Sequence, residues 1–133
     1  MRGFRGGHED LGRLGEALAA RGLRRRGWRV LASRLRTPDA ELDLLAREGA
    51  VLVCVEVKTG RLRRAPGSAA LDLRWRPGLR LNARALERIR RAGRRLAPLG
   101  AELRVDLVEV LVDPGSGEHR LLHHRDLRRP LRS

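Results

Sequence analysis

The chain has 133 residues, which is enough for one hydrophobic core and too few for two ordinary domains. Thirty basic residues against sixteen acidic ones give a net charge of +14, and such a field on a small domain attracts polyanions, with nucleic acid as the first expectation. Two tryptophans, one phenylalanine and no tyrosine are too few for a multi-base stacking platform, which excludes a single-strand binder of that design.

The first half of the chain predicts one helix followed by three strands. Residues 9–26 place Leu11, Leu14 and Leu18 on one helical stripe, and Gly27 is positioned to end the helix. Strands are expected over residues 28–35, 41–46 and 51–58, with a break at 37–40 and a hairpin turn at 47–50.

The second half begins with a long basic segment. Residues 60–81 contain six arginines, two prolines and three glycines without a sustained period, so we expect a mobile loop that contacts the ligand. Asn82 can cap a helix that runs to about residue 97. One face of that helix is a basic ridge made of Arg84, Arg88, Arg91 and Arg95.

A strand over residues 102–112, a turn at 113–117 and a last strand over 118–124 precede a basic tail at about 125–133. The order of elements is helix, three strands, helix, one or two strands, with no internal repeat. It predicts a single domain over residues 1–133, an α/β sandwich with a central sheet flanked by helices.

Lys58 is the only lysine among the thirty basic residues, and it lies two positions after Glu56 at the end of the most apolar run of the chain. Arginine supplies charge and forked hydrogen bonds as well as lysine does, whereas a compact ammonium on a flexible stem is a different chemical tool. A composition that favours arginine elsewhere and keeps lysine here indicates that Lys58 does chemistry.

Carboxylates lie in the same two strands. Strand alternation places Asp43 on one face of its strand, and Glu56 and Lys58 on one face of the next. If Arg47 pairs with Ala50 across the turn, Glu56 is a diagonal neighbour of Asp43 on the same face.

Two carboxylates at that spacing can converge on one hard cation, so Asp43 and Glu56 are candidate ligands of Mg²⁺ or Mn²⁺. Lys58 would then stabilise phosphate charge or help to activate a water. Glu16 is a further candidate, because its neighbours in the helix indicate that it leans toward packed structure.

Spacing alone leaves a plainer alternative open, since a cross-strand ion pair on a solvated sheet face also has this pattern. Cys54 lies inside the apolar run and is expected to be a small buried hydrophobe. The four histidines show no metal-ligand spacing and are expected to be solvated or to contact phosphate. They are His8, His119, His123 and His124.

Five segments in order carry a resemblance to a known family: "LGEALAARGLRRRGWRVL", "AELDLLA", "VCVEVKTG", the second helix and "LRVDLVEV". Over nearly the whole chain they resemble the YraN-like family of small bacterial proteins. The resemblance implies the restriction-endonuclease-like fold of the PD-(D/E)xK nucleases, similar to archaeal Holliday-junction resolvases, with a central mixed sheet.

By this resemblance the nuclease motif falls on Glu16, Asp43, Glu56 and Lys58, as ligands of metal and water and as the catalytic lysine. An Arg-x-Asp motif falls on Arg104 and Asp106, for which a structural role and phosphate contact are both open. Three positions depart from the family's pattern and affect the details of DNA contact. They are Ala40 in place of glycine, Gly60 in place of arginine, and Ala85 in place of a basic residue.

We therefore expect a Mg²⁺- or Mn²⁺-dependent nuclease-like protein that acts on DNA, with branched or structured DNA as one substrate class. A non-catalytic DNA- or RNA-binding module on the same fold and a ribosome-associated factor stay open. We expect a cytoplasmic protein with no membrane partner, and we allow for a homodimer. Nucleic-acid contacts are expected from Arg34, Arg36, Arg61, Arg63, Arg64, Arg84, Arg88, Arg91 and Arg104.

Overall fold

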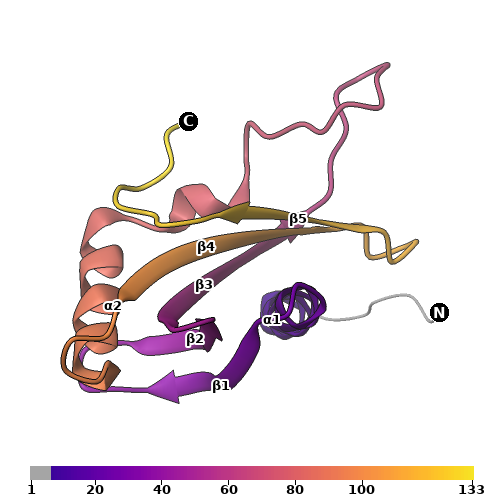
Figure 1. The fold of residues 1–133 in the computed structure, drawn as a ribbon. Helices are drawn as coiled ribbons and strands as arrows, with labels where there is room; N and C mark the ends of the chain where they lie inside the picture. The colour runs from indigo at the N-terminus through magenta and orange to yellow at the C-terminus, as the bar shows by residue number, and fades with distance from the viewer. Residues whose placement is uncertain (1–6) are drawn as a thin grey trace.

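The computed structural model describes residues 7–133, without the side chains of His8 and Glu9, so the expectation for His8 lies outside the described part (Figure 1). Two helices and a five-stranded mixed sheet form the α/β sandwich that the sequence predicts. In chain order the elements are α1 (His8–Arg25), β1 (Arg29–Arg36), β2 (Glu41–Glu48), β3 (Val51–Arg61), the 3-10 helix η1 (Pro77–Arg80), α2 (Ala83–Leu96), β4 (Leu103–Val112) and β5 (His119–His124).

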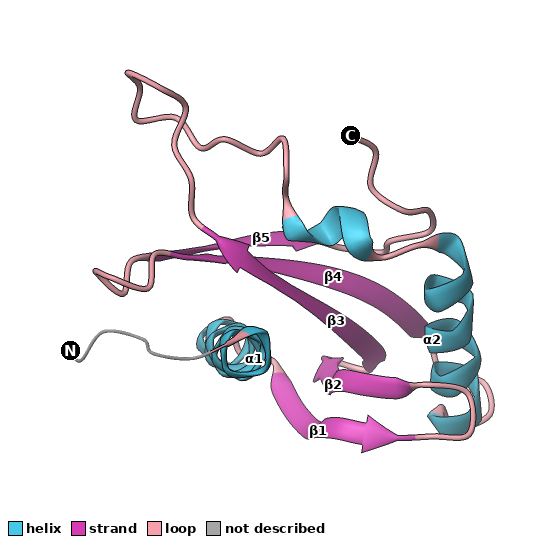
Figure 2. Cartoon of the chain, turned by 180° about the vertical axis from the view of Figure 1, so that it is seen from behind, coloured by secondary structure: helices cyan, strands magenta, loops and turns pink. Residues whose placement is uncertain are grey.

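The strands lie side by side in chain order, from β1 at one edge to β5 at the other. Neighbouring strands are antiparallel except β3 and β4, which are parallel. A parallel pair needs a crossover connection, and the segment that contains η1 and α2 supplies it (Figure 2).

Each helix covers its own face of the sheet. Ala19, Ala20 and Leu23 of α1 pack with Val53 and Val55 of β3, and the predicted leucine stripe of α1 packs against the same core. On the opposite face, Leu86, Ile89 and Ala92 of α2 pack with Leu52 and Cys54 of β3. The alternation predicted for β3 is therefore confirmed, and both of its faces are buried. Cys54 is a buried free thiol whose pKa is raised by burial to about 12, which makes it unreactive.

Local chemistry explains where α1 ends and where α2 begins. Gly27 has a φ of +86° and donates to the carbonyl of Arg24, while Trp28 N donates to Leu23 O, which is the hydrogen-bond pattern of a Schellman motif. The side chain of Asn82 accepts a hydrogen bond of 2.8 Å from Ala85 N at the start of α2.

The basic segment between β3 and α2 has more regular structure than the sequence indicates. Strand β3 continues to Arg61, and η1 occupies Pro77–Arg80, so the irregular stretch is 62–76. Arg64 and Leu71 form an isolated antiparallel bridge within it. The mobility expected of this stretch, called here the basic loop, stays a prediction.

The predicted register of the β2–β3 hairpin was wrong. Arg47 pairs with Leu52, not with Ala50, and Glu48 pairs with Val51 across a two-residue turn at Gly49 and Ala50. A tight turn is favoured because Gly49 adopts a positive φ of +59°. The register is shifted by two residues from the predicted one, so the side chains keep their faces but change their partners.

The predicted alternation of β2 fails at Asp43. Leu42 and Leu45 are three residues apart and yet contribute to the same core, on the α2 side. The backbone of β1 is also irregular at this point. Arg34 has a φ of +51°, which is in the left-handed region that non-glycine residues seldom adopt. This local irregularity, between the paired positions Ser33–Leu44 and Leu35–Leu42, could not be predicted from a period of two.

Candidate functional site

The carboxyl groups of Asp43 and Glu56 meet where the pairing of β2 and β3 ends. Leu44 and Val55 form the last paired position of this hairpin, and Asp43 and Glu56 lie one step further along their strands. Asp43 Oδ2 accepts a hydrogen bond of 2.9 Å from Val57 N, so this side chain takes up a backbone donor that the ladder leaves free. The two carboxyl groups also share a side-chain hydrogen bond. We call them the carboxyl pair.

The pair lies against apolar side chains. Leu42, Cys54 and Ile89 line the recess around it. Burial, together with the hydrogen bond and negative charge of Asp43, raises the pKa of Glu56 to about 9, although the charge of Lys58 and the N–H of Val57 act in the opposite direction. At neutral pH Glu56 therefore holds its proton, as a buried carboxyl group crowded by a second one does without a cation.

Lys58 follows Glu56 on the same face of β3, and its partner on β4 is Glu109. Glu109 is completely buried and accepts from three neighbours. Arg76 Nε lies 3.0 Å from Glu109 Oε1, Gly78 N donates to Oε2 at 2.9 Å, and His124 Nε2 lies 2.7 Å from Oε1. Glu109 and its partners thus join the strand next to Lys58 to the start of η1.

Glu109 is ionised in this arrangement. Burial raises its pKa, but the hydrogen bonds from Arg76, His124 and Gly78 outweigh burial, so the pKa lies below its ordinary value. Neither Glu109 nor Arg76 was predicted as a site residue from the sequence. The available signal was a glutamate in the middle of the apolar strand 102–112, because such a residue is buried only with a partner.

Glu16 is not in contact with the carboxyl pair in this structure. Its carboxylate instead forms an ion pair of 2.9 Å with Arg34 Nε across the groove between α1 and β1. Helix α1 nevertheless lies very close to β3, because a Cβ built on Gly15 would be 1.8 Å from Thr59 Oγ1. Glu16 comes directly after Gly15, the residue at which α1 contacts β3. The side chain of Glu16, however, is held by its ion pair with Arg34.

The predicted nucleic-acid contacts fall in several places. Arg84, Arg88 and Arg91 are exposed on α2, as predicted for the basic ridge, while Arg95 pairs with Asp39. In and beside the basic loop, Arg61 and Arg63 are exposed and Arg64 pairs with Glu118. On β1, Arg36 is exposed and Arg34 pairs with Glu16. Phosphate contact by these residues stays a prediction.

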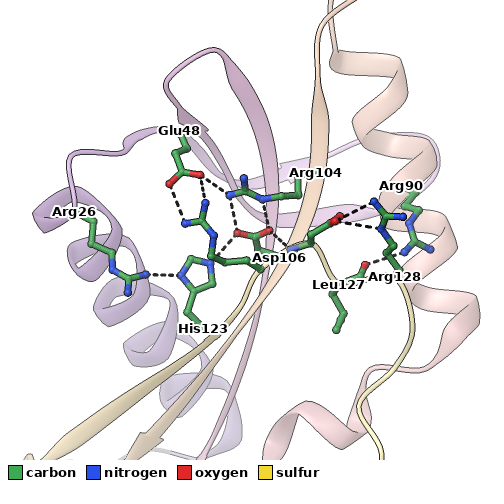
Figure 3. Close-up of polar contacts among 10 residues, drawn as sticks. Arg26, Glu48, Arg90, Arg104, Asp106, His123, Leu127 and Arg128 are labelled. Carbon is green, nitrogen blue, oxygen red and sulfur yellow. Dashed lines mark hydrogen bonds and ion pairs between the residues drawn. The ribbon is translucent and has the colours of Figure 1, made fainter.

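Arg104 belongs to a partly buried network on the α1 side of the sheet, shown in Figure 3. Its guanidinium donates to Asp106 at 2.8 Å and to Glu48 at 2.9 Å, and it lies over the ring of Trp28. Burial raises the pKa of Asp106, but hydrogen bonds from His123, Arg104 and the backbone of Asp126 outweigh it and lower the pKa. The structure thus gives Arg104 and Asp106 structural partners, and phosphate contact by Arg104 stays a prediction.

His123 and His124 are partly buried and contact carboxylates, so the expectation of solvated side chains was wrong for them, and phosphate contact stays a prediction. His123 Nε2 lies 2.8 Å from Asp106 Oδ2, and Arg26 donates to its Nδ1 at 2.8 Å. Because arginine can only donate, Nδ1 accepts and Nε2 carries the proton toward Asp106. His124 contacts Glu109, as described above. Neither contact was predictable without knowing that β5 pairs with β4 in this register.

The carboxyl pair fits a divalent metal by its donor set. In the part of the chain that the structure describes, no group of three or more His, Cys, Asp or Glu side chains could hold a metal ion. Mg²⁺, however, is commonly bound by one or two carboxylates and keeps several waters. The raised pKa of Glu56 beside Asp43 also marks a position where a cation would relieve the crowding of two carboxylates.

The fold and site define an α/β sandwich protein with two carboxyl groups and a lysine on one sheet face. The model of the uncharacterised protein family UPF0102 matches residues 15–110, so the chain belongs to that family, which is the one its sequence motifs indicated. The matched region contains Glu16, the carboxyl pair, Lys58 and Glu109.

Individual relatives agree with the family assignment. The chain is 41% identical over 120 residues to a UPF0102 protein of Renibacterium salmoninarum, which covers 89% of this chain and 95% of the relative. It is also 41% identical over 110 residues to one of Symbiobacterium thermophilum, covering 79% and 83%. A UPF0102 protein of Anaeromyxobacter dehalogenans is 39% identical over 117 residues, covering 88% and 82%.

The names of these relatives state no activity. Among the described residues, neither helix has the length and apolar character needed to cross a membrane.

Proposed function

We propose that this protein is a metal-dependent nuclease-like protein that binds DNA and hydrolyses phosphodiester bonds. The observation that carries the proposal is the contact between the carboxyl groups of Asp43 and Glu56, with Lys58 following on the same face of β3. A protein that only binds phosphate gains nothing from carboxylates on the face toward its ligand, whereas phosphodiester hydrolysis uses such groups to hold a cation.

Asp43 and Glu56 are the residues that would hold Mg²⁺ or Mn²⁺. When bound, the ion supplies Lewis-acid activation of the scissile phosphate and of the attacking water. Asp43 is positioned for this role by Val57 N, which donates to its Oδ2 at 2.9 Å. Lys58 brings a positive charge beside Glu56, where it would stabilise charge that develops on the phosphate.

Exposed arginines on α2 and beside the basic loop would bind the phosphates that flank the scissile bond. Such contacts position the backbone without reading sequence. The resemblance to the YraN-like family, which implies a restriction-endonuclease-like fold, supports the same assignment.

One observation favours a second function, a non-catalytic nucleic-acid-binding protein, for DNA or RNA and including a ribosome-associated role. Glu16, the third acidic residue of the nuclease motif, is held by Arg34 and not beside the carboxyl pair. In this alternative Asp43 serves the fold, because it satisfies the backbone N–H of Val57.

A cleavage screen tests the proposal. Labelled duplex, flap, four-way-junction and RNA substrates are incubated with the protein in Mg²⁺ or Mn²⁺, with a chelator as the blank. We expect metal-dependent cleavage that Asp43→Asn removes and that Glu41→Gln, at an exposed glutamate of the same strand, leaves in place. Tight binding to these substrates without cleavage in either metal would support the second function.

A further inference from the structure

Trp75 is an exposed aromatic side chain in a chain with very few aromatic residues. Its exposed fraction is 77%, whereas Trp28 is 5% exposed and packs in the α1-side core. An indole in water contributes almost nothing to folding, because stabilisation by an aromatic residue comes from the area that it buries. The fold therefore gives no account of a tryptophan at this position.

The backbone on both sides of Trp75 is anchored. Arg74 makes a bidentate contact with Asp72, with distances of 3.1 and 2.8 Å, and Arg76 makes one with the buried Glu109. The ring of Pro77 lies against Gly60, since a Cβ on Gly60 would be 3.2 Å from Pro77 Cδ. The backbone of Trp75 is thus held in place while its indole ring stays in solvent. This anchoring lowers the conformational entropy that the segment loses when a ligand binds.

These anchors attach Trp75 to the candidate site. Arg76 forms an ion pair with Glu109, and Glu109 is the β4 partner of Lys58. Arg80, at the end of η1, donates to Thr59 O at 2.7 Å, one residue after Lys58. The end of the basic loop and η1 are therefore joined to β3, the strand that carries Glu56 and Lys58. Trp75 lies two residues before η1 begins.

The surroundings of Trp75 are cationic. Arg61 and Arg63 are exposed at the other end of the basic loop, and the segment 60–81 has six arginines and one aspartate. An exposed aromatic ring among guanidinium groups matches a ligand that combines phosphates with flat rings. Nucleic acid has both, because every base offers a π-face for stacking and each nucleotide carries one phosphate charge.

We propose that Trp75 stacks on one unpaired base of the nucleic acid bound at the candidate site. The inference rests on the proposed function and names its substrate class: DNA with an unpaired base, as at a flap, gap or branch, in preference to an uninterrupted duplex. In a duplex both faces of each internal base are already stacked, so a single indole finds a free face only where pairing is interrupted. The low aromatic content excludes a multi-base platform and leaves a single stacking contact open.

The test measures binding without cleavage. Affinities for a blunt duplex and for the same duplex with a short unpaired flap are measured by fluorescence anisotropy in chelator, and the tryptophan emission is recorded in the same titration. The variants are Trp75→Ala, Trp75→Phe and a matched control, Leu99→Ala, which changes a fully exposed hydrophobic residue in the turn between α2 and β4.

We expect wild type to prefer the flap and its emission to fall on binding. Trp75→Ala should weaken flap binding by about tenfold, in line with the contribution of one stacked base, and leave duplex binding unchanged. Trp75→Phe should retain most of the preference and, with only buried Trp28 left, show little quenching. Leu99→Ala should behave as wild type.

Four results would overturn the proposal. If Trp75→Ala keeps the full flap preference, or if wild type has none, the stacking role is wrong while the proposed function stands. If wild type binds no nucleic acid, both fail together. If vesicles with anionic lipids quench Trp75 and oligonucleotides do not, the ring contacts a membrane surface instead.

Discussion

The carboxyl groups of Asp43 and Glu56 share a hydrogen bond at the point where the β2–β3 ladder ends. The register of the β2–β3 hairpin brings the two carboxyl groups into contact, because a different register would have separated them. The same contact makes the protein without metal sensitive to pH.

The first prediction concerns Glu56. Burial first, and then Asp43, raise its pKa from 4.5 to about 9 in the folded protein. The folded chain therefore binds this proton more tightly than the unfolded chain, so the stabilisation is fully present below pH 4.5 and is lost as the pH rises toward 9. We expect Glu56→Gln, which cannot ionise, to unfold roughly 5 °C above wild type at pH 9 in chelator.

Thermal unfolding at pH 5 and pH 9 measures this effect, and Glu41→Gln serves as the control at an exposed glutamate of β2. If Glu56→Gln and wild type lose stability in parallel over this range, the raised pKa of Glu56 is contradicted.

The second prediction concerns metal. A cation that binds only the folded carboxyl pair must stabilise the fold, and it competes with the proton on Glu56. Millimolar Mg²⁺ or Mn²⁺ should raise the unfolding temperature, by more at pH 8 than at pH 6, and Asp43→Asn should abolish the rise. An equal rise in the variant would place the ions elsewhere on the protein.

Much of the fold was predictable because local chemistry agrees with the final structure. The leucine stripe of α1, the Asn82 cap and the apolar run of β3 each indicated their element. The continuation of β3 to Arg61 was not predictable, since it depends on pairing with β4 up to the Arg61–Val112 position.

The candidate site was predictable only in part. Period-two patterning placed Glu56 and Lys58 on one face, but the tight turn at Gly49 set the register, and the interruption at Asp43 depends on β1. Glu109 was missed because its partners, Arg76 and His124, come from segments 33 and 15 residues away. Glu16 was predicted from its helix, whereas its actual partner is set by the backbone of Arg34.

The third prediction compares two glycines of α1. A Cβ on Gly15 would lie 1.8 Å from Thr59 Oγ1, so Gly15→Ala must push α1 away from β3. We expect a loss of about 2 to 3 kcal/mol in the free energy of unfolding.

Gly12→Ala is the matched control, because its added Cβ meets nothing within 4 Å and alanine favours a helix over glycine by about 0.5 to 1 kcal/mol. Urea unfolding of both variants measures the difference. Equal effects at the two positions would contradict the close approach of α1 to β3.

The fourth prediction concerns the basic ridge. Affinity for duplex DNA should fall linearly on a log–log plot against salt, and replacing Arg84, Arg88 and Arg91 together by alanine should reduce the slope by about 2 to 3. Arg21, Arg24 and Arg25, exposed on α1, provide a control triple with the same charge change and an unchanged slope. The reverse outcome would place the phosphate track on α1.

The fifth prediction concerns the only lysine. Lys58→Arg keeps the charge and should fold and bind DNA with nearly unchanged affinity. The guanidinium is larger, planar and never deprotonated, so it cannot take the place of the ammonium beside Glu56 without displacing a neighbour. Catalysis should therefore fall by about a hundredfold, the size of effect expected for a misplaced group.

Single-turnover cleavage of a flap substrate is measured in Mn²⁺ for wild type and Lys58→Arg, and binding is measured in parallel in chelator. This comparison tests the central assignment, that Asp43, Glu56 and Lys58 form a nuclease site. We expect metal-dependent cleavage by wild type, a rate about a hundredfold lower in the variant and equal affinity. Cleavage by Lys58→Arg at the wild-type rate would contradict this assignment.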